Sequence, residues 1–130
     1  MSKLFRLLSA ALTSACLLVS APSHAQVPGV TAERILLGQS GPQTGSLSAL
    51  NNDFLAGIQL YLERVNFEGG IHGRKLELLA LDDAYTPERT EQNVARLINE
   101  DGVFALLGVF GTGQNQRAMP LAEAEGVPYI

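Results

Sequence analysis

The chain has 130 residues, of which 46% are hydrophobic and 17% charged, with 9 basic against 13 acidic side chains. This balance leaves no basic stripe for phosphate groups, so we expect no nucleic-acid partner. The one cysteine is Cys16, in the leader described next, which excludes disulfides, thiolate catalysis and cysteine-bound metals from residues 26–130.

Residues 1–25 are predicted to be a cleavable export signal. Lys3 and Arg6 make a positive start, and residues 7–21 form an apolar run interrupted only by small hydroxyl residues. Small residues then precede a cleavage point before Gln26. We therefore expect the remainder of the chain in the periplasm, as one small domain.

Two other interpretations of the leader are disfavoured. A membrane anchor would need a longer apolar run and a stop-transfer flank. A lipoprotein signal at Cys16 would need leucine where Thr13 stands, and the apolar run would not continue past the cysteine as it does here.

Hydrophobic periodicity after the leader predicts alternating strands and helices. Residues 34–39 are expected to form a short buried strand, and a polar loop follows over residues 40–48. The next helix is expected to have Asp53 as its N-cap and to end at Gly69-Gly70. Its buried face is expected to carry Phe54, Leu55, Ile58, Tyr61, Leu62 and Val65.

Residues 75–81 are predicted to form the second strand, with Asp82 and Asp83 at its carboxyl end. The second helix is expected to begin with Thr86 as a hydroxyl N-cap and Pro87 at the first helical position. Its buried stripe is expected to consist of Val94, Leu97 and Ile98.

A third strand is predicted over residues 103–107, and a third helix is expected to run from Thr112, as its N-cap, to about Glu125. Pro120 lies inside this helix and removes a backbone hydrogen bond, so we expect a kink or a helix in two pieces. A fourth strand is expected to begin at residues 127–130. The third helix is expected to be buried through Ala118, Met119 and Ala122.

This order of elements predicts an α/β fold with a parallel sheet and helices on both of its faces. The second and third strands are too continuously apolar for a sheet with one wet face. Ligands of such sheets bind outside the carboxyl ends of the strands, where residues 40–50 and 111–113 are expected to form loops.

The loop after the third strand carries glycines at 108, 111 and 113. A strand–loop–helix junction leaves backbone N–H groups free, and the helix dipole favours an anion there. The G-x-x-G-x-G spacing is not that of a dinucleotide site, and no lysine follows as in a P-loop. The pattern alone is equally compatible with ligand contact and with a tight turn that needs glycine.

The remaining polar residues form no pattern typical of an enzyme. Asp82 and Asp83 lack partners for acid–base or metal chemistry, so we expect them to accept hydrogen bonds from nearby loop N–H groups. His72 is expected to be an exposed polar side chain, and Arg117 a solvated charge near the glycine loop. We therefore predict no catalytic residue, no bound metal and no cofactor.

Six sequence blocks make the chain resemble the leucine/isoleucine/valine-type periplasmic binding proteins, the solute receptors of ABC importers. The most distinctive block is VNFEGGIHGRK at residues 65–75. The others are GQSGPQTG at 38–45, AGIQL at 56–60, LDDAYTP at 81–87, GVFGTG at 108–113 and EGVP at 125–128. Six such blocks in order behind an export signal are specific, although each alone would be weak evidence.

The resemblance implies a type I periplasmic-binding fold, in which two lobes close on a solute, and a membrane permease as the partner. It implies that Thr112 holds the carboxylate of an amino acid or related solute, with backbone N–H groups beside it at Gly111 and Gly113. Leu50 would face the side chain of the ligand. Some branched-chain amino-acid binders carry a disulfide where this chain has Tyr85 and Gly111, so their particular ligand does not transfer directly.

The same resemblance makes residues 26–130 an incomplete N-terminal lobe, with the hinge and the second lobe beyond Ile130. We expect this segment alone neither to bind solute tightly nor to close, and its unpaired sheet edge to lower its solubility. Two other functions stay open. A ligand-sensing domain of a receptor would be followed by a transmembrane segment. An exported nucleotide-type α/β enzyme would need a glycine fingerprint after the first strand, which residues 38–41 do not supply.

Overall fold

The computed structural model describes residues 27–130, so the export signal predicted over residues 1–25 lies outside the described residues. Strands and helices alternate in the order predicted from the sequence. They are β1 (Arg34–Gly41), α1 (Ser48–Phe67), β2 (Lys75–Asp82), α2 (Pro87–Asn99), β3 (Ala105–Leu106) and α3 (Thr112–Ala124). Within this part of the chain, no helix is both long and apolar enough to cross a bilayer.

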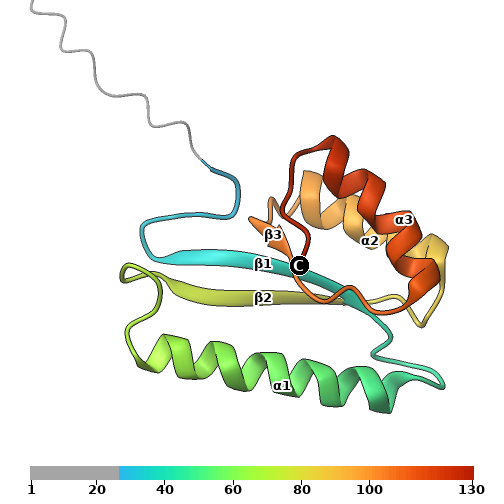
Figure 1. Cartoon of the computed structure of the whole chain (residues 1–130), viewed down its shortest axis with the longest axis horizontal. Coiled ribbons are helices and arrows are strands. Elements are labelled where there is room, and N and C mark those ends of the chain that lie inside the picture. The colour runs from blue at the N-terminus through green and yellow to red at the C-terminus, as the bar shows by residue number, and fades with distance from the viewer. Residues whose placement is uncertain (1–26) are drawn as a thin grey trace, which may run out of the picture.

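The three strands form a parallel sheet in the order β2-β1-β3 (Figure 1). β3 is only two residues long, shorter than predicted. The predicted fourth strand begins beside it, because Tyr129 forms a parallel bridge with Leu106. The N–H of Leu106 donates to the Pro128 carbonyl at 2.9 Å, and the N–H of Ile130 donates to the Leu106 carbonyl at 2.9 Å.

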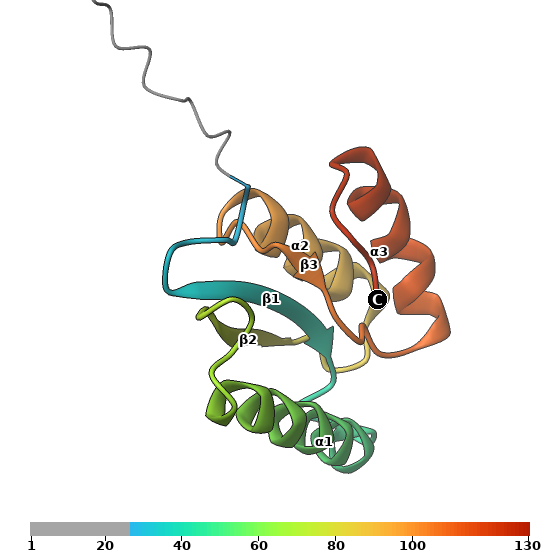
Figure 2. The ribbon, with the colours of Figure 1, turned by 60° about the vertical axis from the view of Figure 1, so that its left-hand side comes forward.

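Helices cover both faces of the sheet, as Figure 2 shows with α1 on one side and α2 and α3 on the other. One apolar cluster lies between the sheet and the α2–α3 pair and contains Val94, Leu97 and Leu106. A second lies under α1 and contains Leu37 and Leu62. The predicted α/β fold with a parallel sheet and helices on both faces is therefore confirmed.

α1 begins at Ser48 with Leu47 as its N-cap, six residues before the predicted cap Asp53, which lies within the helix. The Ser48 hydroxyl donates to the Gly45 carbonyl at 2.8 Å, and the Asn51 N–H donates to the Leu47 carbonyl at 3.1 Å. Residues 48–52 contain no proline or glycine, so nothing delays the first turn. The loop predicted to contain Leu50 is therefore shorter, and Leu50 is helical.

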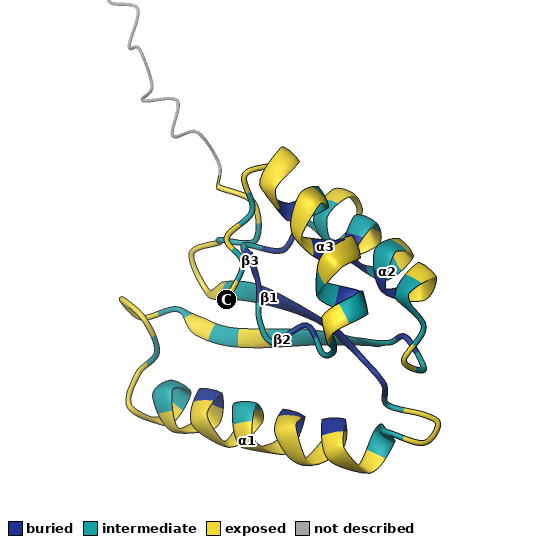
Figure 3. Cartoon of the chain, turned by 45° about the vertical axis from the view of Figure 1, so that its right-hand side comes forward, coloured by how far each residue is buried: buried dark blue, intermediate teal, exposed yellow. Residues whose placement is uncertain are grey.

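The predicted apolar face of α1 is only partly buried. Leu55 and Leu62 are buried, whereas Phe54 is 44% exposed and Tyr61 is 66% exposed. Most of the helix is accordingly coloured as exposed in Figure 3. The hydrophobic period identified the helix correctly, but within the described residues α1 has one neighbouring layer to pack against.

α3 differs from the prediction at its start and in its middle. Gly111 is the N-cap, with φ 110° and ψ 145°, and Thr112 is the first helical residue instead of the cap. The helix is continuous across Pro120, so the alternative of two separate pieces is wrong. Ala118 and Ala122 are buried as predicted, but Met119 is 54% exposed.

Candidate functional site

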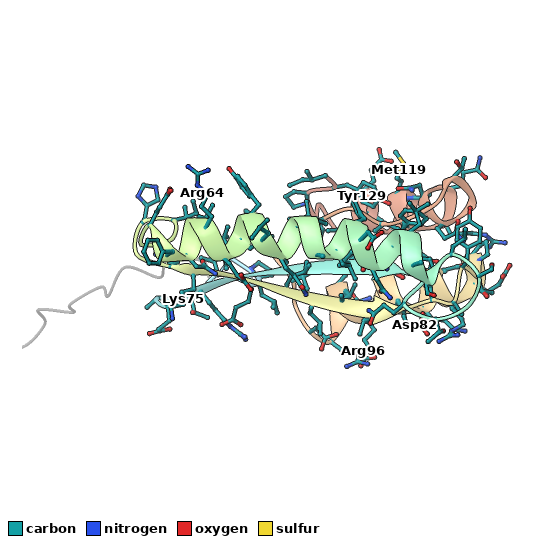
Figure 4. All side chains as sticks on the ribbon, turned by 90° about the horizontal axis from the view of Figure 1, so that it is seen from below. Arg64, Lys75, Asp82, Arg96, Met119 and Tyr129 are labelled. Atoms are coloured by element: carbon teal, nitrogen blue, oxygen red, sulfur yellow. The ribbon has the colours of Figure 1, made fainter. Side chains whose placement is uncertain are left out.

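The carboxyl ends of the strands meet at one edge of the sheet. Lys75 and Asp82 mark the two ends of β2 in Figure 4, and Asp82 lies at the carboxyl end. The loop before α1, the turn before α2 and the loop before α3 all leave from this edge. Because ligands of parallel sheets bind outside the carboxyl ends of the strands, this edge is the candidate site.

The start of α3 presents free backbone donors at this edge. Within residues 27–130, the N–H groups of Gly111, Thr112, Gly113 and Gln114 donate no hydrogen bond, whereas the Asn115 N–H donates to the Gly111 carbonyl at 2.9 Å. The Thr112 side chain is exposed beside them. Free N–H groups at the positive end of a helix dipole can receive an anion such as a carboxylate.

Two side chains that sequence reasoning missed fix the shape of this loop. The Asn115 amide donates to the carbonyls of Val109 and Gly111, and the Tyr129 hydroxyl donates to the Asn115 side-chain oxygen at 2.5 Å. Burial raises the pKa of Tyr129 to about 12, so the hydroxyl keeps the proton that it donates. No local sequence pattern predicts the contact between Asn115 and Tyr129, because Tyr129 reaches Asn115 through the pairing of residues 127–130 with β3.

Gln114 also escaped the sequence interpretation. The residue is 2% exposed, and its amide forms no hydrogen bond within the described part of the chain, although it is not among the buried amides that are closed off from solvent. The amide lies against Gly111, where an added Cβ would stand 2.2 Å from Gln114 Oε1 and 2.9 Å from Tyr85 Cε2. Glycine at 111 therefore makes room for both side chains, in addition to allowing the positive φ.

Asp82 ties the loop after β1 to the turn after β2. One carboxylate oxygen accepts hydrogen bonds from the N–H groups of Gln43, Thr44 and Ala84, and the other accepts from the Thr44 hydroxyl at 2.7 Å. Burial alone would raise the pKa of Asp82, but these hydrogen bonds outweigh it and lower the pKa from 3.8 to about 2. Asp82 is thus an ionised structural carboxylate, as predicted.

Asp83 is fully buried and joins β1, β2 and α2. Its carboxylate accepts hydrogen bonds from the Ser40 hydroxyl at 2.9 Å, the Thr90 hydroxyl at 2.8 Å and the Tyr85 N–H at 2.9 Å. Thr86 occupies the N-cap position of α2 as predicted, but its hydroxyl makes no capping bond. Both aspartates thus accept hydrogen bonds from the loops and strands around them. Residues 27–130 contain no group of three or more His, Cys, Asp or Glu that could hold a metal.

The predicted site residues fall in two places. Gly111, Thr112 and Gly113 lie together at the start of α3. Leu50 lies in the first turn of α1, on the other side of the sheet, and is 58% exposed. His72 is an exposed turn residue near the amino end of β2, away from this edge.

Comparison with known proteins places the chain in a family. Residues 34–130 match the family described as periplasmic binding protein, and the chain therefore belongs to it. A Leu/Ile/Val-binding protein homolog 7 of Brucella suis biovar 1 (strain 1330) is 30% identical over 96 residues, which are 74% of this chain and 24% of that protein. The chain thus spans about a quarter of the length of the curated relatives it matches.

Solved structures agree with this assignment. A possible leucine/isoleucine/valine-binding protein from Rhodopirellula baltica SH 1 superposes with a TM-score of 0.72 and 28% identity, over 82% of this chain and 28% of that one. A fatty acid ABC transporter substrate-binding protein from Thermomonospora curvata superposes with a TM-score of 0.69 and 30% identity, over 77% of this chain and 25% of that one. The resemblance inferred from the six sequence blocks is confirmed.

Proposed function

We propose that the protein is the solute-binding component of an ABC importer and that it receives a small carboxylate, such as an amino acid, at the carboxyl edge of its sheet. The observation that carries this proposal is the set of free N–H groups from Gly111 to Gln114. The names of the relatives support it, since leucine, isoleucine, valine and fatty acids all carry a carboxylate.

In this proposal each predicted residue has a distinct task. The N–H groups of Gly111 and Gly113 and the hydroxyl of Thr112 donate to the carboxylate. Because Thr112 is exposed at the first position of α3, its hydroxyl can turn toward a bound anion without disturbing the core. Leu50, exposed at the start of α1, contributes an apolar contact to the remainder of the solute.

A complete site requires contacts from outside residues 27–130. The edge that carries the free N–H groups is open, and the relatives that the chain matches are about four times as long. We therefore propose that a second lobe closes over this edge, and that the closed form is what a membrane permease recognises in the periplasm. Binding without catalysis is the function that we propose for this site, and it is supported by the structural hydrogen bonds that both aspartates at the edge accept.

The test is isothermal calorimetry of the full-length gene product, which contains the proposed second lobe. It is titrated with leucine and with leucinamide, which lacks the carboxylate. We expect leucine to bind and leucinamide to show no measurable heat. Thr112→Ala should weaken leucine binding at least about tenfold, since a hydrogen bond to a charged group contributes roughly 1.5–3 kcal/mol. Thr112→Ser keeps the hydroxyl and should bind like the parent protein.

A matched control is Thr31→Ala, which removes a hydroxyl that bonds Glu33 and the Arg34 N–H at the opposite end of the sheet. It should leave leucine affinity unchanged. Equal binding of leucine and leucinamide would contradict a carboxylate site at the N–H groups of residues 111–114, which we call the carboxylate seat.

A further inference from the structure

We propose that the solute carries an aromatic ring, and that this ring packs against three aromatic side chains next to the start of α3. This inference rests on the proposed function, because it takes the carboxylate to be held by the N–H groups of residues 111–114. The three side chains are Phe54, Phe110 and Tyr85, and we refer to them as the aromatic row.

The aromatic row crosses the carboxyl edge of the sheet. The ring centroid of Phe110 lies 6.2 Å from that of Phe54 and 6.4 Å from that of Tyr85, with interplanar angles of 54° and 60°. These are the tilted arrangements and distances at which aromatic rings attract one another. Phe54 comes from α1, Phe110 from the loop before α3 and Tyr85 from the turn before α2, so the row connects both helical layers.

The aromatic row adjoins the carboxylate seat. Phe110 directly precedes Gly111, and the Tyr85 ring lies so close to Gly111 that an added Cβ would stand 2.9 Å from Tyr85 Cε2. A carboxylate held by the N–H groups of Gly111 and its neighbours would therefore have its substituent within reach of two rings. Phe54 extends the same surface over Gly108, where an added Cβ would stand 2.8 Å from Phe54 Cε1.

The rings are available to a ligand. Phe54 is 44% exposed and Tyr85 is 43% exposed, although phenylalanine is among the residue types most often buried. A bound ring would remove this surface from water and add edge-to-face contacts that an aliphatic side chain cannot make. A row of three rings therefore favours an aromatic over an aliphatic solute of the same length.

Gln114 gives independent evidence that something binds at this point. The residue is 2% exposed, and its side-chain oxygen lies against Gly111, where an added Cβ would stand 2.2 Å from it. Its amide has no hydrogen-bond partner within residues 27–130, and it is not among the buried amides that are closed off from solvent. A polar group of the solute at the start of α3 would give this amide a partner in place of water.

The experiment compares aromatic acids with their saturated counterparts in binding to the full-length gene product. Two pairs of ligands are compared: 3-phenylpropionate with 3-cyclohexylpropionate, and phenylalanine with cyclohexylalanine. The members of each pair differ only in whether the ring is aromatic. By calorimetry we expect the aromatic member of a pair to bind about fivefold more tightly, which corresponds to the usual range for an aromatic contact beyond its buried area.

Variants of the aromatic row test the cause of this preference. Phe110→Leu and Tyr85→Leu keep an apolar side chain without a ring, so each should bring the aromatic-to-saturated affinity ratio close to one. Phe67→Leu is the matched control, because Phe67 is 93% exposed at the last position of α1, and it should leave the ratio unchanged.

The outcomes separate this inference from the function on which it rests. If a saturated acid binds as tightly as the aromatic member of its pair, or leucine binds as tightly as phenylalanine, the aromatic inference is overturned. The proposed carboxylate seat is then still supported. If none of these carboxylates binds, the proposed function is overturned as well. Should a leucine variant fail to fold, as judged by circular dichroism, the panel with the parent protein still decides between these outcomes.

Discussion

The carboxylate of Asp82 shows how one side chain holds two loops at the site. Its hydrogen bonds to Gln43, Thr44 and Ala84 lower its pKa to about 2 against the opposing effect of burial. The folded state therefore favours the ionised form more than the unfolded chain does. This contribution to stability is fully present above pH 4 and is lost as the pH falls toward 2.

We predict that Asp82→Asn lowers the free energy of unfolding at pH 7 by about 1–2 kcal/mol and flattens its decrease between pH 4 and pH 2. Urea titrations of the full-length gene product at pH 7, 4 and 2.5 measure both effects. Asp53→Asn alters an exposed carboxylate on α1 and should leave the free energy of unfolding at pH 7 unchanged. If the free energy of unfolding of Asp82→Asn decreases between pH 4 and pH 2 as steeply as that of the parent protein, these hydrogen bonds do not stabilise the loops.

At the scale of the elements, side chains also fasten helices to the sheet. Asn66, near the end of α1, donates to the Leu76 carbonyl at 2.8 Å and accepts from the Leu76 N–H at 2.7 Å. The amide thus satisfies both main-chain groups of one residue on β2, which is an outer strand in the described sheet. This contact holds the end of α1 that lies farthest from the site.

We predict that Asn66→Ala destabilises the protein by about 1–3 kcal/mol, because both main-chain groups of Leu76 lose their partner. Hydrogen exchange should show faster exchange at the Leu76 amide, with little change at the start of α3. Asn66→Asp retains the acceptor for the Leu76 N–H and should be less damaging. Asn52→Ala, on the exposed side of α1, serves as the control and should have little effect.

The sequence predicts the order of the elements because strands and helices here have distinct hydrophobic periods and glycine or proline at most of their ends. It places the start of α1 wrongly because Asp53 resembles a cap, whereas the actual N-cap is Leu47, whose carbonyl accepts from the Asn51 N–H and whose side chain makes no capping bond. Burial on α1 is overpredicted at Phe54 and Tyr61, since periodicity does not reveal how much of a helix face has a neighbour.

The candidate site is predicted only as far as it is local in sequence. Gly111, Thr112 and Gly113 are neighbours in the chain, so the glycine pattern alone brings them together. Gln114 and the Tyr85–Phe110 contact depend on which loops meet in space, and no spacing rule connects residues 85 and 110. Such contacts follow from the strand order β2-β1-β3 and from the conformation of the turn after β2.

The molecule as a whole exposes surfaces that typical α/β domains cover. A groove of about 470 Å³ beside α1 is lined by apolar side chains, including Phe54, Ile58, Tyr61 and Leu107. Ile130, at the outer side of β3, is 71% exposed. Apolar surface gathered in this way marks a contact surface, so the groove and the edge at Ile130 are available for further structure.

Residues 26–130 expressed alone should therefore give no measurable heat of binding with amino acids or aromatic acids that the full-length gene product binds. The segment offers the N–H groups of residues 111–114 but only one wall of the site, so the carboxylate would stay largely in contact with water and gain little. Circular dichroism and hydrogen exchange establish that the isolated segment is folded before calorimetry is performed. Micromolar affinity of a folded, monomeric segment would show that one lobe is sufficient for binding and would contradict the requirement for a second.

The exposed edge strand and the groove beside α1 also predict that the isolated segment associates as its concentration rises. Light scattering measures this association, and Ile130→Lys should reduce it by placing a charge at the edge.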